Sequence, residues 1–130
     1  MTVTLLVVDD EDDVRLSLRM MLRRPGWAVL EAPSGEEALD LCRRGGVDVL
    51  ILDHKMPGLA GIDVARILRG EGFRRPIILY SAYLTPQIEA DAEELGVWAV
   101  AKEDVEELMD TLQDVTENGH RKKEDDGVKG

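Results

Sequence analysis

Short apolar segments alternate with longer amphipathic segments along the first 117 residues. The apolar segments are rich in Val, Leu and Ile, which is typical of strands buried on both faces of a parallel sheet. The pattern predicts strands at 3–8, 27–32, 47–52, 76–82 and 97–101.

The amphipathic segments carry apolar residues at helical spacing and recognisable helix-start signals. Ser34 followed by Glu37 is a capping-box pattern, and Thr85 before Pro86 predicts a second helix start. Helices are expected at 12–24, 34–44, 61–70, 85–95 and 103–117. Their inward faces include Val14, Leu18, Met21 and Leu22 in the first helix, and Val105, Leu108, Met109, Leu112 and Val115 in the last.

Five β–α units in strict alternation predict an α/β fold, an open doubly wound parallel sheet with helices on both faces. No internal repeat or linker interrupts residues 1–117, so we expect one domain there. Residues 118–130 are charged and contain glycine, and we expect a disordered tail.

Composition limits the possible partners. The net charge is −11, which argues against nucleic-acid or anionic-membrane binding and favours cations or basic partners. The single cysteine excludes an internal disulfide and suits a reducing compartment. Because no segment has the length of a membrane span or the pattern of a signal peptide, the sequence predicts a cytoplasmic protein.

Polar side chains follow four of the predicted strands. They are Asp9 and Asp10, Asp53, Ser81 and Lys102. The carboxyl ends of parallel strands share one edge of a sheet, so we expect these side chains to converge. Clustered carboxylates repel one another, and an all-oxygen ligand set favours Mg²⁺ as the cation that relieves the repulsion. With a lysine and a hydroxyl beside them, the group suits phosphoryl transfer onto an aspartate.

These segments also carry a family resemblance. "LLVVDDE", "LILDHKMPGLAG", "LYSA" and the strand-terminal Lys102 resemble the receiver domain of two-component response regulators over roughly residues 3–116. The resemblance implies a flavodoxin-like (βα)5 fold with strand order 2-1-3-4-5. It also implies that Asp53 accepts a phosphoryl group from a sensor histidine kinase or a histidine phosphotransfer protein.

The resemblance assigns roles to the other residues of the group. Asp10 would bind Mg²⁺ directly, Asp9 mostly through water, and Lys55 through its backbone carbonyl. Ser81 would follow the phosphoryl group as the switch hydroxyl, with Lys102 paired to it. In this family, the positions of Lys55 and Tyr83 influence the lifetime of the acyl phosphate.

Two departures from the family pattern concern the fifth strand. Glu103 follows Lys102 where the family usually has proline, often after a cis bond. A cis bond before a non-proline residue costs roughly 3 kcal/mol, so this loop is either trans and reshaped or strained. Ala99 stands where the family has Tyr or Phe, and the segment from Gly96 is one residue short. Trp98 is the nearest aromatic and the possible switch, although in a strand it would face away from Ala99.

The interpretation is a stand-alone receiver without an output domain. It would be a monomer or a phosphorylation-dependent dimer, and not a dedicated turnover enzyme. It would signal to an unidentified protein through its fourth helix, fifth strand and fifth helix. Two alternatives remain: a haloacid-dehalogenase-like phosphatase, and a pseudo-receiver that binds partners without phosphorylation. A chain cut from a longer regulator is also compatible with the sequence.

Overall fold

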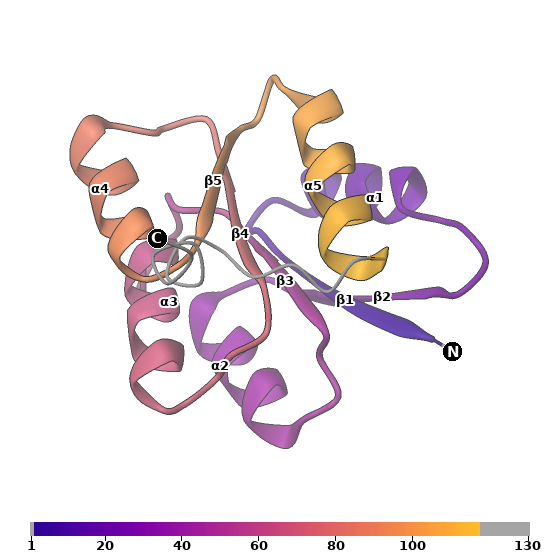
Figure 1. The fold of residues 1–130 in the computed structure, drawn as a ribbon, viewed down its shortest axis with the longest axis horizontal. Coiled ribbons are helices and arrows are strands. Elements are labelled where there is room, and N and C mark those ends of the chain that lie inside the picture. The colour runs from indigo at the N-terminus through magenta and orange to yellow at the C-terminus, as the bar shows by residue number, and fades with distance from the viewer. Residues whose placement is uncertain (1, 118–130) are drawn as a thin grey trace, which may run out of the picture.

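The computed structural model describes residues 2–117, which form one parallel sheet with helices on both faces (Figure 1). The strand order is β2-β1-β3-β4-β5, which confirms the predicted α/β fold. The strands are β1 (Val3–Val8), β2 (Trp27–Ala32), β3 (Val49–Leu52), β4 (Ile77–Ser81) and β5 (Trp98–Ala101). The helices are α1 (Asp12–Met21), α2 (Gly35–Arg44), α3 (Gly61–Gly70), α4 (Pro86–Glu94) and α5 (Val105–Glu117).

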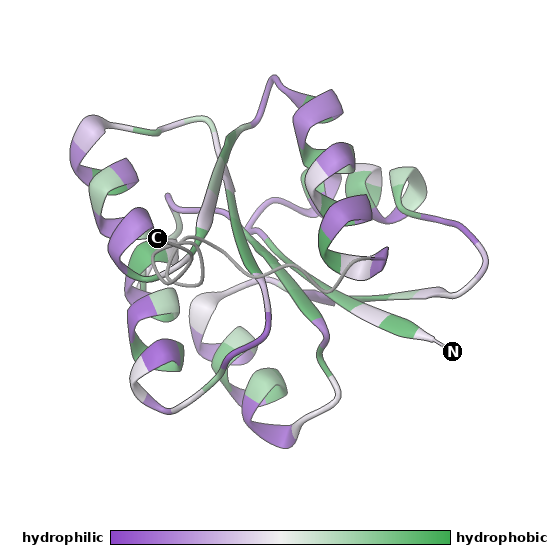
Figure 2. Ribbon diagram, in the orientation of Figure 1, coloured by the Kyte–Doolittle hydropathy of each residue, from purple (hydrophilic) through white to green (hydrophobic). Residues whose placement is uncertain are grey.

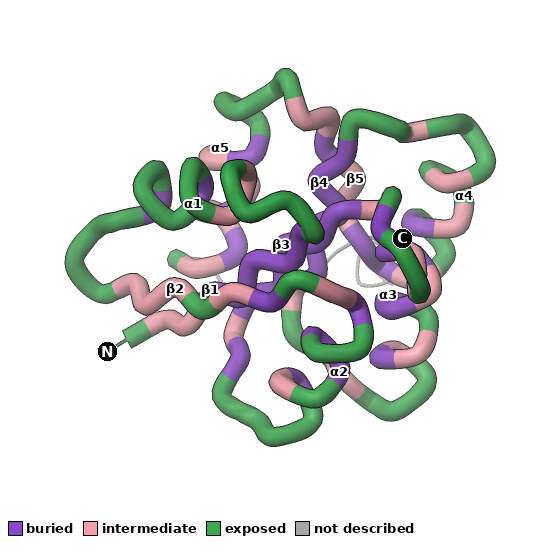
Figure 3. The backbone as a smooth tube through the Cα atoms, turned by 180° about the vertical axis from the view of Figure 1, so that it is seen from behind, coloured by how far each residue is buried: buried purple, intermediate pink, exposed green. Residues whose placement is uncertain are grey.

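Two apolar clusters hold the layers together. Helices α2, α3 and α4 cover one face of the sheet and α1 and α5 cover the other (Figure 1). Side chains alternate between the faces along each strand, so Leu50 packs in the first cluster and Ile51 in the second. The strands are hydrophobic while the helices carry purple hydrophilic turns (Figure 2), and the central strands are buried on both sides (Figure 3).

The pairing register brings the polar strand ends together. Val8 of β1 pairs with Leu52 of β3, so Asp9 and Asp53 are the next residues on neighbouring strands. Ser81, the last residue of β4, pairs with Ala101 of β5, directly before Lys102. The order of strands reverses between β1 and β3, which is where doubly wound sheets place their sites.

Some predicted boundaries and inward positions were wrong. Helix α1 ends at Met21 instead of residue 24, since Pro25 disfavours helical conformation in the residue before it. Strand β3 begins at Val49 instead of residue 47, and the Asp48 carboxylate accepts a hydrogen bond from the Thr4 N–H at 2.8 Å. Met21 and Val105, expected to face inward, are 38% and 39% exposed.

Two predicted helix starts are confirmed. The Ser34 hydroxyl accepts a hydrogen bond from the Glu37 N–H at 3.2 Å, and the Thr85 hydroxyl accepts one from the Ile88 N–H at 3.1 Å. Each bond satisfies a backbone donor that has no partner within its helix.

Arg69, near the end of α3, links two loops at the amino-terminal edge of the sheet, the edge opposite the polar strand ends. Its guanidinium donates to backbone carbonyls of Phe73 and Arg75 before β4, at 2.8 and 2.9 Å. It also donates to the carbonyls of Leu95 and Gly96 before β5, at 2.8 and 3.0 Å. One side chain therefore joins the two loops that lead into neighbouring strands.

The expected tail, 118–130, lies outside the described residues. No helix within residues 2–117 has the length and apolar character needed to cross a membrane.

Candidate phosphorylation site

Three carboxylates meet at the carboxyl edge of the sheet. Asp9 and Asp53 are buried, with 1% and 7% of their surface exposed, whereas Asp10 is exposed. Their nearest carboxylate oxygens all lie within 4.8 Å of one another. The structure thus brings together the acids that the sequence placed at two separate strand ends.

Lys102 is the cation of this group. Its Nζ lies 2.7 Å from Oδ2 of Asp9 and 3.6 Å from Oδ2 of Asp53. Burial lowers the pKa of Lys102, but the hydrogen bond to Asp9 and the two negative charges outweigh burial and raise that pKa. The ammonium therefore stays charged beside the carboxylates.

For Asp53, burial has a larger effect on the pKa than the nearby positive charge has. Burial raises the pKa of its carboxyl group above the ordinary 3.8, and the charge of Asp9 adds to that effect. Lys102 and the His54 N–H, which donates to Oδ1 of Asp53 at 2.8 Å, only partly offset the increase. The ionised carboxylate is therefore under-compensated, and more positive charge near it would be favourable.

Two loops line the hollow above Asp53. The hollow, about 730 Å³, is lined by Asp10, Asp53, Lys55, Tyr83 and Lys102 among others. The Lys55 ammonium lies 4.4 Å from the centre of the Tyr83 ring, so the β3–α3 and β4–α4 loops touch across it. Ser81 is fully buried below them, where its hydroxyl accepts a hydrogen bond from the Tyr83 N–H at 3.1 Å.

Trp98 and Ala99 lie on opposite faces of the sheet. Trp98 packs in the cluster on the α1 and α5 face, and Ala99 packs against the cluster on the other face. The loop after β5 contains no cis bond, so the trans alternative for the Lys102–Glu103 bond holds.

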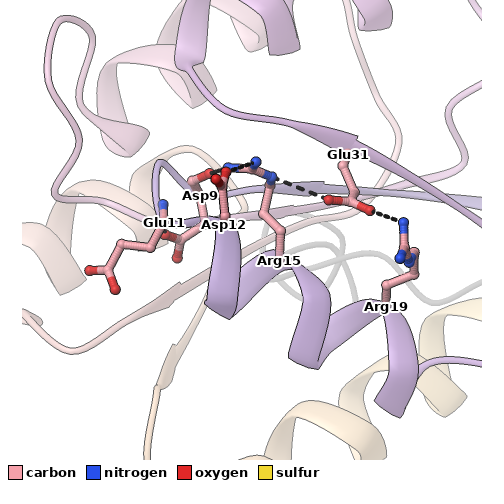
Figure 4. Close-up of polar contacts among 6 residues, drawn as sticks. All are labelled: Asp9, Glu11, Asp12, Arg15, Arg19 and Glu31. Atoms are coloured by element: carbon pink, nitrogen blue, oxygen red, sulfur yellow. Dashed lines mark hydrogen bonds and ion pairs between the residues drawn. The ribbon is translucent and has the colours of Figure 1, made fainter.

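Arg15 is a residue whose contribution was not predicted. On α1 its guanidinium donates to the backbone carbonyl of Asp9 at 2.6 Å and to the Glu31 carboxylate of β2 at 3.2 Å (Figure 4). It also pairs with Asp12, and Arg19 reaches the other oxygen of Glu31 at 2.7 Å. Nothing in the sequence pattern indicates that Arg15 holds the acidic loop, the segment Asp9–Glu11 that follows β1.

Gly61, the first residue of α3, makes a close contact that the sequence did not indicate. A Cβ atom there would lie 2.2 Å from the backbone oxygen of Asp53, so the start of α3 packs tightly against the backbone of Asp53. Nδ1 of His54 accepts a hydrogen bond from the Ile62 N–H at the same helix start, at 3.4 Å.

Known proteins decide the family. The response regulator receiver domain matches residues 5–113. The chain belongs to this family. Response regulator MprA of Mycobacterium tuberculosis is 46% identical to this chain over 82 residues, which are 63% of this chain and 36% of MprA. The match therefore spans little more than a third of that relative.

Solved structures agree with the family. TrrA of Thermotoga maritima, a response regulator crystallised with Mg²⁺ and beryllofluoride, is 32% identical with a TM-score of 0.78, over 88% of this chain and 99% of TrrA. The chemotaxis protein CheY4 of Vibrio cholerae is 27% identical with a TM-score of 0.79, over 88% of this chain and 99% of CheY4.

Proposed function

We propose that this receiver domain takes a phosphoryl group onto Asp53 from a phosphohistidine of a sensor kinase or phosphotransfer protein. The observation that carries the proposal is the buried Asp53 carboxylate, clustered with Asp9 and Asp10 and 3.6 Å from the Lys102 ammonium. A carboxylate nucleophile flanked by fixed positive charge is what phosphoryl transfer requires.

The residues divide the chemistry among them. Oδ1 of Asp53 accepts the His54 N–H, and Oδ2 faces Lys102. As a carboxylate oxygen bonds to phosphorus, the phosphorus–nitrogen bond of the donor breaks and the imidazole leaves with its electron pair. Lys102 and the Ser81 hydroxyl then donate to phosphoryl oxygens, which carry the charge of the transition state.

The donor set fits magnesium. Three carboxylates, two of them buried, supply oxygen ligands only, and burial raises the pKa of Asp53, so more positive charge beside this carboxylate would favour its ionised form. Asp9, Asp10, Asp53 and the backbone carbonyl of Lys55 would hold the ion. When bound, Mg²⁺ supplies charge that neutralises carboxylate and phosphoryl oxygens.

The test is incubation with acetyl phosphate and Mg²⁺, followed by borohydride reduction and peptide mapping. We expect homoserine at position 53, and none in Asp53→Asn. Asp63→Asn, which changes an exposed carboxylate on α3, serves as the matched control. Label at Asp9 or Asp10 would favour the phosphatase alternative instead.

A pseudo-receiver is the second candidate, because Trp98 packs on the face opposite Ala99 and leaves the site without an aromatic switch. Absence of label from the wild-type chain, together with no response to beryllofluoride, would favour it. Label without any change in the α4, β5 and α5 surface would indicate a phosphate acceptor that does not signal through that surface.

The remaining part of the proposal concerns output. We expect the domain to act in the cytoplasm without a turnover activity of its own, and to signal by protein contacts through α4, β5 and α5. Sedimentation with and without beryllofluoride distinguishes a monomer from a phosphorylation-dependent dimer.

A further inference from the structure

We propose that Tyr80 is a positioning residue that holds Lys102 at the site through the backbone of the β5–α5 turn. The inference rests on the proposed role of Lys102 in phosphoryl transfer to Asp53. The Tyr80 hydroxyl donates a hydrogen bond to the backbone carbonyl of Lys102 at 2.8 Å.

Strand β4 holds both polar backbone groups of Lys102. The Lys102 N–H donates to the carbonyl of Ser81 at 3.0 Å, and the carbonyl of Lys102 accepts from Tyr80, the residue before Ser81. Pairing between β4 and β5 ends at Ser81 and Ala101, so Lys102 lies just beyond the paired register. The Tyr80 hydroxyl therefore gives the Lys102 carbonyl a hydrogen bond from a side chain, at a position beyond the end of the strand pairing.

The hydrogen bonds to β4 determine where the Lys102 ammonium lies. Lys102 extends from this turn to Asp9 and Asp53, and Glu103 and Asp104, the next two residues, are exposed. An exposed turn offers little packing to restrain the Lys102 peptide, so the two bonds to β4 restrain it: Ser81 fixes its N–H and Tyr80 fixes its carbonyl. Ser81 and Lys102, the two donors expected to meet the phosphoryl group, are thus set by adjacent residues of one strand.

A hydroxyl at this position needs such a partner. Tyr80 is 5% exposed and packs in the same apolar cluster as Ile78 and Val100, where an unpaired hydroxyl would be unfavourable. Burial also raises the pKa of Tyr80, so its hydroxyl stays protonated and able to donate. An apolar side chain could fill this space, and the hydroxyl adds only the bond to Lys102.

The experiment removes the hydroxyl alone, with Tyr80→Phe in the full chain. We expect the rate of Asp53 labelling by acetyl phosphate to fall about fivefold, the worth of one ordinary hydrogen bond. In a Lys102→Ala background the same change should alter the residual rate less than twofold, because no ammonium remains to be positioned. Equal effects in both backgrounds, or no effect in the wild type, would overturn the proposal.

Thr116→Val is the matched control. It removes another hydroxyl that donates to a backbone carbonyl, that of Leu112 at 2.7 Å, on α5. We expect this variant to label Asp53 at the wild-type rate.

A second readout does not depend on phosphorylation. The chain has five lysines, so ¹³C-lysine labelling resolves Lys102, assigned with Lys102→Arg. Tyr80→Phe should shift the Lys102 side-chain signal and leave that of Lys55 in place, and an unchanged Lys102 signal would contradict the proposal. A wild-type chain that takes no label would refute the proposed function, while this measurement would still decide the role of Tyr80.

Discussion

Asp53 combines a negative charge that the proposed function requires with surroundings that oppose ionisation. Burial and the nearby Asp9 raise its pKa, even with Lys102 3.6 Å away. In the proposed function Asp53 must be ionised to attack phosphorus, so the site would sacrifice some stability of the metal-free domain for a reactive carboxylate.

This predicts a particular pH dependence of stability. The pKa of Asp53 is higher in the folded state than the 3.8 of the unfolded chain. Between these two pKa values the folded state holds a proton that the unfolded state has released, so the free energy of unfolding falls as the pH rises. Asp53→Asn has no carboxyl group to titrate at position 53, so its free energy of unfolding should fall less over this pH range. Without metal, the variant should be at least as stable as the wild type at pH 7. Thermal unfolding of both proteins from pH 3.5 to 7 measures this difference in stability. A variant less stable at pH 7 would contradict the prediction.

Gly61→Ala should damage the domain through the backbone of Asp53. The new Cβ would lie 2.2 Å from the Asp53 oxygen and 2.9 Å from Cα of His54, and neither atom can move freely. We expect a loss of about 1–3 kcal/mol in the free energy of unfolding, measured in urea. Gly70→Ala, in the same helix with no atom within 4 Å, is the control. It should gain stability by up to about 1 kcal/mol, and equal losses in both variants would be evidence against this explanation.

Between elements, Arg15 links the acidic loop to α1 and β2 (Figure 4). Arg15→Met should weaken Mg²⁺ binding about tenfold, the lower end for loss of a residue that orients a metal ligand. Titration calorimetry measures the change. Arg19→Met is the matched control, because Arg19 is half-exposed and its guanidinium donates to Glu31, as that of Arg15 does, from one turn further along α1. Equal weakening by both variants would assign the effect to general loss of positive charge.

The contact between the Lys55 ammonium and the Tyr83 ring joins the β3–α3 and β4–α4 loops above Asp53. If the pair shields the acyl phosphate from water, Lys55→Met and Tyr83→Leu should each change its lifetime by about two- to fivefold. The double variant should then differ little from either single one, because the contact is already lost. Decay of ³²P label on Asp53 gives the lifetimes, and fully multiplicative effects would show that the residues act separately.

Sequence reasoning succeeded where a side chain's position follows from strand order. Asp9, Asp53, Ser81 and Lys102 follow buried strands, and the edge of a parallel sheet brings them together whatever the details of packing. It failed where the role depends on distance across space. Arg15 reaches a carbonyl, Gly61 touches a backbone and Tyr80 donates to a turn, and no periodicity records such contacts.

For the whole molecule, binding at the carboxyl edge should stabilise the complete fold. Mg²⁺ with beryllofluoride would contact residues after β1, β3, β4 and β5, so unfolding must release the ligand. At a ligand concentration 100-fold above its Kd, the gain should be about 2.7 kcal/mol. Urea unfolding of the wild type and of Asp53→Asn measures the gain. An equal gain in the variant would place the ligand elsewhere.

Arg69 restrains the two loops at the edge of the sheet opposite the candidate site. It joins the loops before β4 and β5 at the far ends of the strands that end in Ser81 and Ala101. Because Arg69 restrains those ends, we expect a rearrangement at Ser81 and Lys102 to displace β4 and β5 least near Arg69 and most at the carboxyl edge. The widest displacement then falls at the β4–α4 and β5–α5 loops. A partner that reads the phosphorylated state would gain most by binding there, and least by binding near Gly96.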